Sequence, residues 1–63
     1  MTYAEAIKIL RNKMLLTQTE FAKKLGVKVG TVNRWEAGAF EPTMKTKRKL
    51  AKLFVEYGIK VGE

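Results

Sequence analysis

The sequence contains no cysteine and no histidine. Disulfides and Cys-based zinc sites are therefore excluded, as are imidazole metal ligands and imidazole acid–base catalysis. No nucleophile–base pair or phosphate-cradling glycine loop is present either, so we expect no enzyme activity, no metal and no cofactor. No apolar run approaches the ~18 residues of a membrane-spanning helix. The first ten residues lack the pattern of a secretory signal, so we expect a cytoplasmic protein.

What the chain does have is positive charge. Thirteen Lys and Arg residues against six Asp and Glu give a formal net charge of +7. Such an excess favours an anionic partner, which could be nucleic acid, an acidic protein or an anionic membrane, although basic charge also serves solubility alone. With 63 residues, the chain is expected to form one small domain over residues 1–63.

The first expected helix covers residues 3–15. Apolar side chains recur there at helical spacing, at Tyr3, Ile7, Leu10 and Met14. Thr2 and Glu5 have the spacing of a capping box, in which each side chain accepts a hydrogen bond from a free backbone amide.

A second helix is predicted over residues 18–25. Thr17 and Glu20 repeat the capping-box spacing, and Gly26 is suited to end the helix because glycine adopts positive φ without penalty. A third helix is predicted from residue 28 or 29 to residue 37. Its start is poorly capped, because Lys28 stands where Ser, Thr, Asp or Asn is preferred.

A fourth helix is predicted between Thr43, its cap, and Gly58. The remaining tail, residues 59–63, is compatible with a strand, a last turn or a frayed end. No repeat or linker interrupts the sequence. The pattern therefore predicts an all-α fold, a compact bundle of four to five helices.

The third helix has two unlike faces. At 3.6 residues per turn, Val32 and Trp35 share the face that packs inward, and Gly30, Asn33, Arg34 and Ala37 lie on the other. Asn suits the N6 and N7 atoms of adenine, and Arg suits the O6 and N7 atoms of guanine in the major groove of DNA. The alternative is that Asn33 and Arg34 are ordinary solvent-facing residues.

These features together resemble the phage repressor and Cro-like helix-turn-helix family, also called the xenobiotic-response-element type. The resemblance covers residues 7–54. It rests on Ile7, Leu10, Arg11, Thr17, Gln18, Glu20, Ala22, Leu25, Gly26, Val27, Val32, Trp35, Glu36, Gly38, Pro42, Leu50 and Ala51. It implies a lambda-repressor-like fold with the helix-turn-helix core in residues 17–38, and a third helix that lies in the major groove.

The resemblance also implies roles for single residues. Base contacts are expected at Gln18, Val29, Gly30, Asn33 and Arg34. The resemblance implies a phosphate contact at Thr31, and phosphate contacts are also expected at Thr17, Lys28, Lys45 and Lys49. Lys45 and Lys49 belong to a cationic helix start, which opposes the helix dipole and thereby hints at phosphate binding, with a solvated face as the alternative. Arg11 and Glu36 match a family ion pair, although Arg11 could also contact phosphate or water.

The sequence thus favours a sequence-specific regulator of transcription, a repressor that binds double-stranded DNA. We expect a homodimer on a palindromic site, with the fourth helix and residues 57–61 as its interface, and a nucleoid location if the source is a bacterium or phage. One alternative is a protein-interaction module of the same fold, such as an antitoxin or an assembly subunit. Another, a cationic helix on a membrane surface, is disfavoured by the short helices that glycines interrupt.

Overall fold

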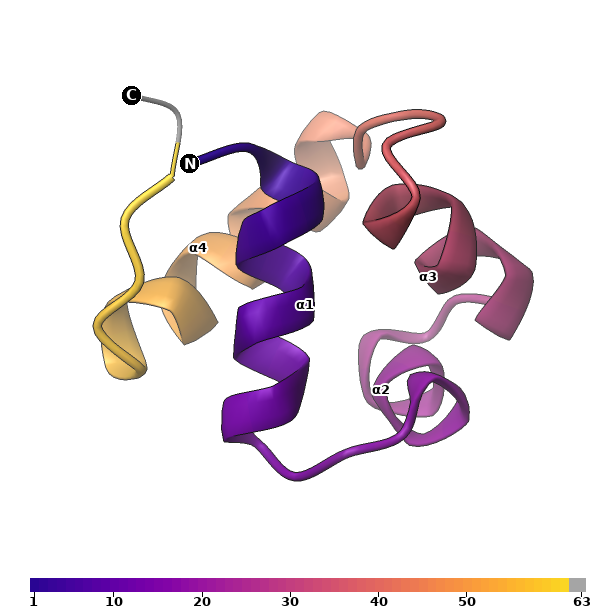
Figure 1. Cartoon of the computed structure of the whole chain (residues 1–63), viewed down its shortest axis with the longest axis horizontal. Coiled ribbons are helices and arrows are strands. Elements are labelled where there is room, and N and C mark those ends of the chain that lie inside the picture. The colour runs from indigo at the N-terminus through magenta and orange to yellow at the C-terminus, as the bar shows by residue number, and fades with distance from the viewer. Residues whose placement is uncertain (62–63) are drawn as a thin grey trace.

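The computed structural model describes residues 1–61 and places four helices in them (Figure 1). The helices are α1 (Tyr3–Lys13), α2 (Gln18–Leu25), α3 (Val29–Glu36) and α4 (Met44–Glu56). The predicted all-helical fold is confirmed for these residues. Part of the tail prediction, at residues 62 and 63, lies outside the described residues.

Threonine is the N-cap residue of three of the helices. In α1 the amide of Glu5 donates to Thr2 Oγ1 at 3.2 Å, and the amide of Thr2 donates to Glu5 Oε1 at 3.0 Å. The matching distances at Thr17 and Glu20 in α2 are 3.1 and 2.8 Å. Both predicted capping boxes are therefore confirmed. Thr43 caps α4, whereas Lys28 gives α3 no side-chain hydrogen bond.

One backbone pattern closes all four helices. An amide donates to the carbonyl five residues earlier: Leu16 to Arg11, Val27 to Ala22, Ala39 to Arg34 and Ile59 to Phe54. This pattern requires a left-handed residue just before the donor. Glycine holds that position after α2, α3 and α4, but Leu15 holds it after α1, with φ of 59°. As a result α1 ends at Lys13, two residues before the end predicted from the sequence.

The core lies between the four helices. Its buried residues are Ala6, Ile7, Leu10, Phe21, Ala22, Leu25, Val32, Trp35, Leu50, Phe54 and Ile59. The predicted apolar faces of α1 and α3, together with Phe21, Ala22 and Leu25 of α2, supply most of them.

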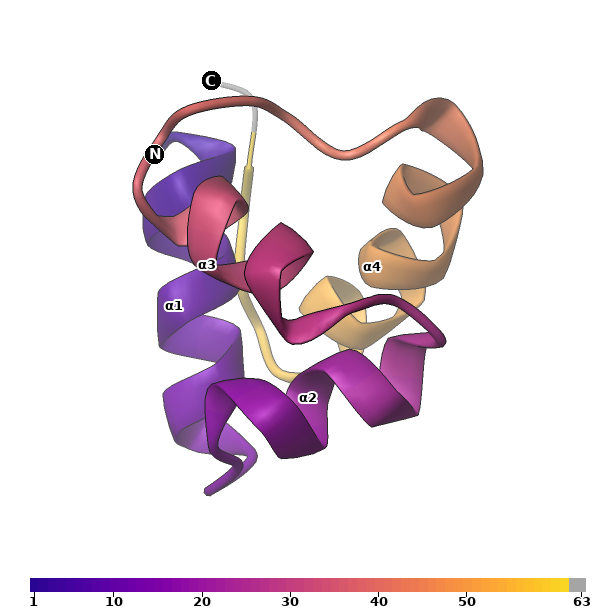
Figure 2. The same cartoon turned by 90° about the vertical axis from the view of Figure 1, so that its right-hand side faces the viewer.

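The tail after α4 folds back onto the core. Ile59 is buried, and residues 59–61 run beside α1 as neither helix nor strand (Figures 1 and 2). None of the helices in residues 1–61 combines the length and the apolar character that crossing a membrane requires.

Candidate nucleic-acid interface

Helix α3 is fixed to the domain by its inner face. It crosses α2, and both helices stand at the front of Figure 2. Val32 is fully buried and Trp35 is 4% exposed, as the two-faced pattern predicted. These two side chains hold α3 against the core, so the opposite face is left to solvent.

The solvent-exposed surface of α3 includes the four residues that were predicted to meet base edges. Val29, Gly30, Asn33 and Arg34 are all exposed. Apart from its chain neighbours and the backbone of its own helix, no heavy atom of residues 1–61 lies within 4 Å of the position that a Cβ on Gly30 would take. Packing inside the domain therefore does not require glycine there, although glycine weakens a helix interior.

The first residue of α2 belongs to a chain of hydrogen bonds that reaches the outer face. Gln18 Nε2 donates to Glu36 Oε1 at 3.2 Å, and Asn33 Nδ2 donates to Gln18 Oε1 at 3.4 Å. Gln18 is half-buried between its two partners. The structure thus brings together two predicted base-reading residues, Gln18 and Asn33, and connects them to the carboxylate of Glu36.

Glu36 is held from the other side by Arg11. Nε of Arg11 donates to Oε2 at 2.7 Å and Nη2 donates to Oε1 at 3.0 Å, while Nη1 donates to the carbonyl of Leu16 at 3.1 Å. Burial alone raises the pKa of Glu36, but the hydrogen bonds from Arg11 and Gln18 and the charge of Arg11 outweigh it and lower the pKa below 4.5. The carboxylate is therefore ionised at neutral pH.

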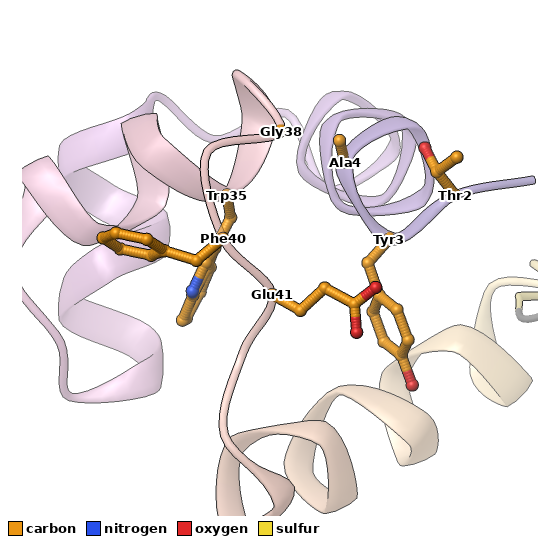
Figure 3. Close-up of a pocket in the computed structure, with 7 residues that line it drawn as sticks. All are labelled: Thr2, Tyr3, Ala4, Trp35, Gly38, Phe40 and Glu41. Carbon is orange, nitrogen blue, oxygen red and sulfur yellow. The ribbon is translucent and has the colours of Figure 1, made fainter.

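Arg34 has a different partner. Its guanidinium lies 5.8 Å from the centroid of the Phe40 ring, within cation–π range. Phe40 is 56% exposed and also lines a cavity of about 250 Å³ beside Trp35 (Figure 3). Phe40 is thus an exposed loop residue whose ring contacts Arg34 on the exposed face of α3.

The residues expected at phosphates are spread over three helices. Thr17, Lys28, Lys45 and Lys49 are exposed and Thr31 is half-buried. Thr17 Oγ1 already accepts the amide of Glu20. Within residues 1–61, neither Lys45 nor Lys49 forms an ion pair.

Lys47, from the same cationic stretch, forms contacts within the domain. It pairs with Glu41 at 2.9 Å and lies 4.7 Å from the centroid of the Tyr3 ring. Lys47 therefore differs from Lys45 and Lys49, its neighbours in the cationic start of α4. The sequence did hold one signal, because Glu41 lies six residues before Lys47 across the turn that starts α4.

Comparison with known proteins agrees with this arrangement. A family model described as "Helix-turn-helix" matches residues 7–54. An uncharacterized HTH-type transcriptional regulator of Methanocaldococcus jannaschii is 42% identical over 48 residues, which cover 76% of this chain and 68% of that protein. One from Archaeoglobus fulgidus is 40% identical with the same coverage. No solved structure matches the chain. The resemblance in the sequence is thus confirmed, and the chain belongs to the helix-turn-helix family.

Proposed function

We propose that this protein binds double-stranded DNA at specific sequences and regulates transcription, with α3 in the major groove. The observation that carries the proposal is the division of α3 into two faces. Val32 and Trp35 are buried, whereas Gly30, Asn33 and Arg34 are exposed on the opposite side and Val29 is exposed at the flank of the first turn. The major groove of B-DNA, about 12 Å wide, admits an α-helix presented in this way.

The exposed face has the chemistry that base reading needs. Arg34 can donate two hydrogen bonds to guanine O6 and N7, and Asn33 can pair with adenine N6 and N7. Val29 offers an apolar contact for a thymine methyl group, and Gly30 permits close approach. Gln18 stands beside Asn33 and is placed to meet a base or the sugar–phosphate backbone.

Phosphate contacts would supply most of the affinity. We assign them to Thr17, Lys28, Thr31, Lys45 and Lys49. Three observations support this assignment: Lys45 and Lys49 form no ion pair within residues 1–61, Lys28 provides no side-chain cap, and the net charge is +7. Uncapped amides in the first turn of α3 can donate to a phosphate, and each lysine that meets a phosphate releases counterions.

Repression by occupying a promoter is the mechanism that we infer. One recognition helix reads few base pairs, so we expect two copies on a palindromic site. α4 and residues 57–61 are the proposed interface, and Val55, which is 81% exposed on α4, supports an apolar contact there. Two helix-turn-helix relatives named as transcriptional regulators support the regulatory role.

Selection of bound duplexes from a random pool, at a stated salt concentration, tests the proposal. The expected result is enrichment of one palindromic motif, whose half-site spacing reports the dimer. Lys49→Ala should reduce the slope of log K against log salt by about one unit. Lys47→Ala is the control, because its ammonium already pairs with Glu41. Equal binding to all duplexes would favour the protein-interaction alternative.

A further inference from the structure

We propose that Gln18 and Glu36 set the base preference of Asn33, so that the protein accepts adenine and rejects guanine at the base pair Asn33 reads. This inference rests on the proposed function. It concerns the chain of hydrogen bonds from Glu36 through Gln18 to Asn33. Its basis is the count of donors and acceptors that each group can offer.

The ionised carboxylate of Glu36 accepts hydrogen bonds and donates none. Gln18 must therefore turn its Nε2 toward Glu36, where the distance to Oε1 is 3.2 Å. The orientation of a glutamine amide is in this way decided by its partner. Gln18 Oε1 then faces the other side, toward Asn33.

The oxygen of Gln18 decides the orientation of Asn33 in turn. Asn33 must present Nδ2 to Gln18 Oε1, and the distance is 3.4 Å. A side-chain amide has two N–H donors and one carbonyl acceptor. One N–H is thus engaged within the protein, which leaves one N–H and the Oδ1 atom of Asn33 for the groove.

One donor beside one acceptor matches adenine, whose N7 accepts and whose N6 donates. Guanine offers two acceptors, N7 and O6, and would set O6 against the Oδ1 atom of Asn33. An Asn33 freed from Gln18 could turn its amino group toward guanine and donate both N–H groups. The hydrogen-bond chain therefore removes the arrangement that guanine needs.

Glu36 acts here as a positioning residue. Its side chain is 7% exposed and faces Arg11 on α1, whose guanidinium holds both carboxylate oxygens. Because Glu36 is withdrawn from solvent, its influence on a base has to pass through Gln18. Hydrogen bonds thus connect the Arg11–Glu36 ion pair to the exposed side chain of Asn33.

The test compares base preference at one position. Selection with wild type and Asn33→Ala identifies the base pair whose preference Asn33 confers. Affinities are then measured for duplexes that differ only there. Wild type should prefer adenine over guanine by at least about fivefold. Gln18→Ala and Glu36→Gln should both lower that ratio to about twofold or less. In each variant the hydrogen-bond chain no longer fixes the orientation of the Asn33 amide.

Two variants are needed because Gln18 could itself touch the same base, whereas Glu36 is withdrawn from the surface. Thr19→Ala, an exposed neighbour on α2, is the control and should keep the wild-type ratio. Thermal melts at the assay temperature exclude unfolding as the cause. An unchanged ratio in Glu36→Gln, or a wild-type preference for guanine, overturns the inference. A wild type without preference at any base pair instead overturns the proposed function.

Discussion

Arg11 and Glu36 join the first helix to the end of the third through a bidentate ion pair, with donor–acceptor distances of 2.7 and 3.0 Å. Their side chains are 16% and 7% exposed. Arg11 also donates to the carbonyl of Leu16, so it holds the turn between α1 and α2 as well. Loss of either partner leaves the other, partly buried charge unpaired. This lowers the free energy of unfolding more than the loss of a surface ion pair does.

Arg11→Ala should lower the free energy of unfolding by about 2–3 kcal/mol, somewhat less than for a fully buried pair. Urea titration followed by circular dichroism measures this change. Glu41→Ala breaks the exposed pair with Lys47 and is the comparison, with an expected loss of at most about 0.5 kcal/mol. Equal losses in the two variants would contradict the structural role of Arg11.

Acid should destabilise the protein through three glutamates. Backbone amide hydrogen bonds lower the pKa of Glu5 and of Glu20, and hydrogen bonds to Arg11 and Gln18 lower the pKa of Glu36 despite its burial. A lowered pKa gives stability that is present above the ordinary value of 4.5 and is lost as the pH falls through the folded value. Without histidine, the melting temperature should stay nearly constant between about pH 5 and about pH 8.

Glu36→Gln isolates one of these contributions. Its melting temperature should fall less between neutral and acid pH than that of wild type, because the residue no longer takes up a proton. An acid-induced fall as large as that of wild type would show that Glu36 does not contribute to it.

Leu15→Gly should stabilise the protein. Leu15 is 89% exposed and has φ of 59°, so it gives little burial and occupies a strained backbone region. The left-handed conformation costs a non-glycine residue about 1–2 kcal/mol, and the greater chain entropy of glycine offsets part of that gain. The expected net gain is about 0.5–1 kcal/mol in urea titration. Leu15→Ala keeps the strain and should give no gain; equal gains would point to the exposed side chain instead.

Gly30→Ala should separate stability from binding. Beyond its chain neighbours and its own helix backbone, no atom of residues 1–61 lies within 4 Å of the added methyl group, so the free energy of unfolding should rise by up to about 0.5–1 kcal/mol. Affinity for the selected duplex should fall if α3 approaches the groove closely at this position. Unchanged affinity would place Gly30 away from the DNA surface.

Arg34→Ala should lower affinity for the preferred duplex by roughly 1–3 kcal/mol and relax one base position. Arg34→Lys keeps the charge but loses the bidentate geometry, so it should recover nonspecific affinity without the base preference. Competition binding on matched duplexes measures both effects. A uniform loss on every duplex would assign Arg34 to phosphate instead.

The helices could be predicted from sequence because their signals are local. Thr2, Thr17 and Thr43 mark three starts, and glycine marks three ends. The left-handed conformation of Leu15 was not predicted, because no local rule favours leucine in that conformation. The inner face of α3 could also be predicted, because Val32 and Trp35 are large apolar residues at helical spacing.

The side-chain partners of the site were less predictable because they join distant positions. Asn33 lies fifteen residues after Gln18, and the angle between α2 and α3 decides that they meet. Phe40 reaches Arg34 only because the chain reverses after Gly38. Such contacts depend on tertiary geometry, which residue type and spacing do not specify.

Trp35 is the single tryptophan of the chain and is almost wholly buried on the inner face of α3. Its emission therefore arises from one known place, beside Phe40 in the cavity that both residues line (Figure 3). Trp35 is therefore an intrinsic fluorescent probe. Fluorescence spectra can follow both denaturation and the arrival of a duplex without any added dye.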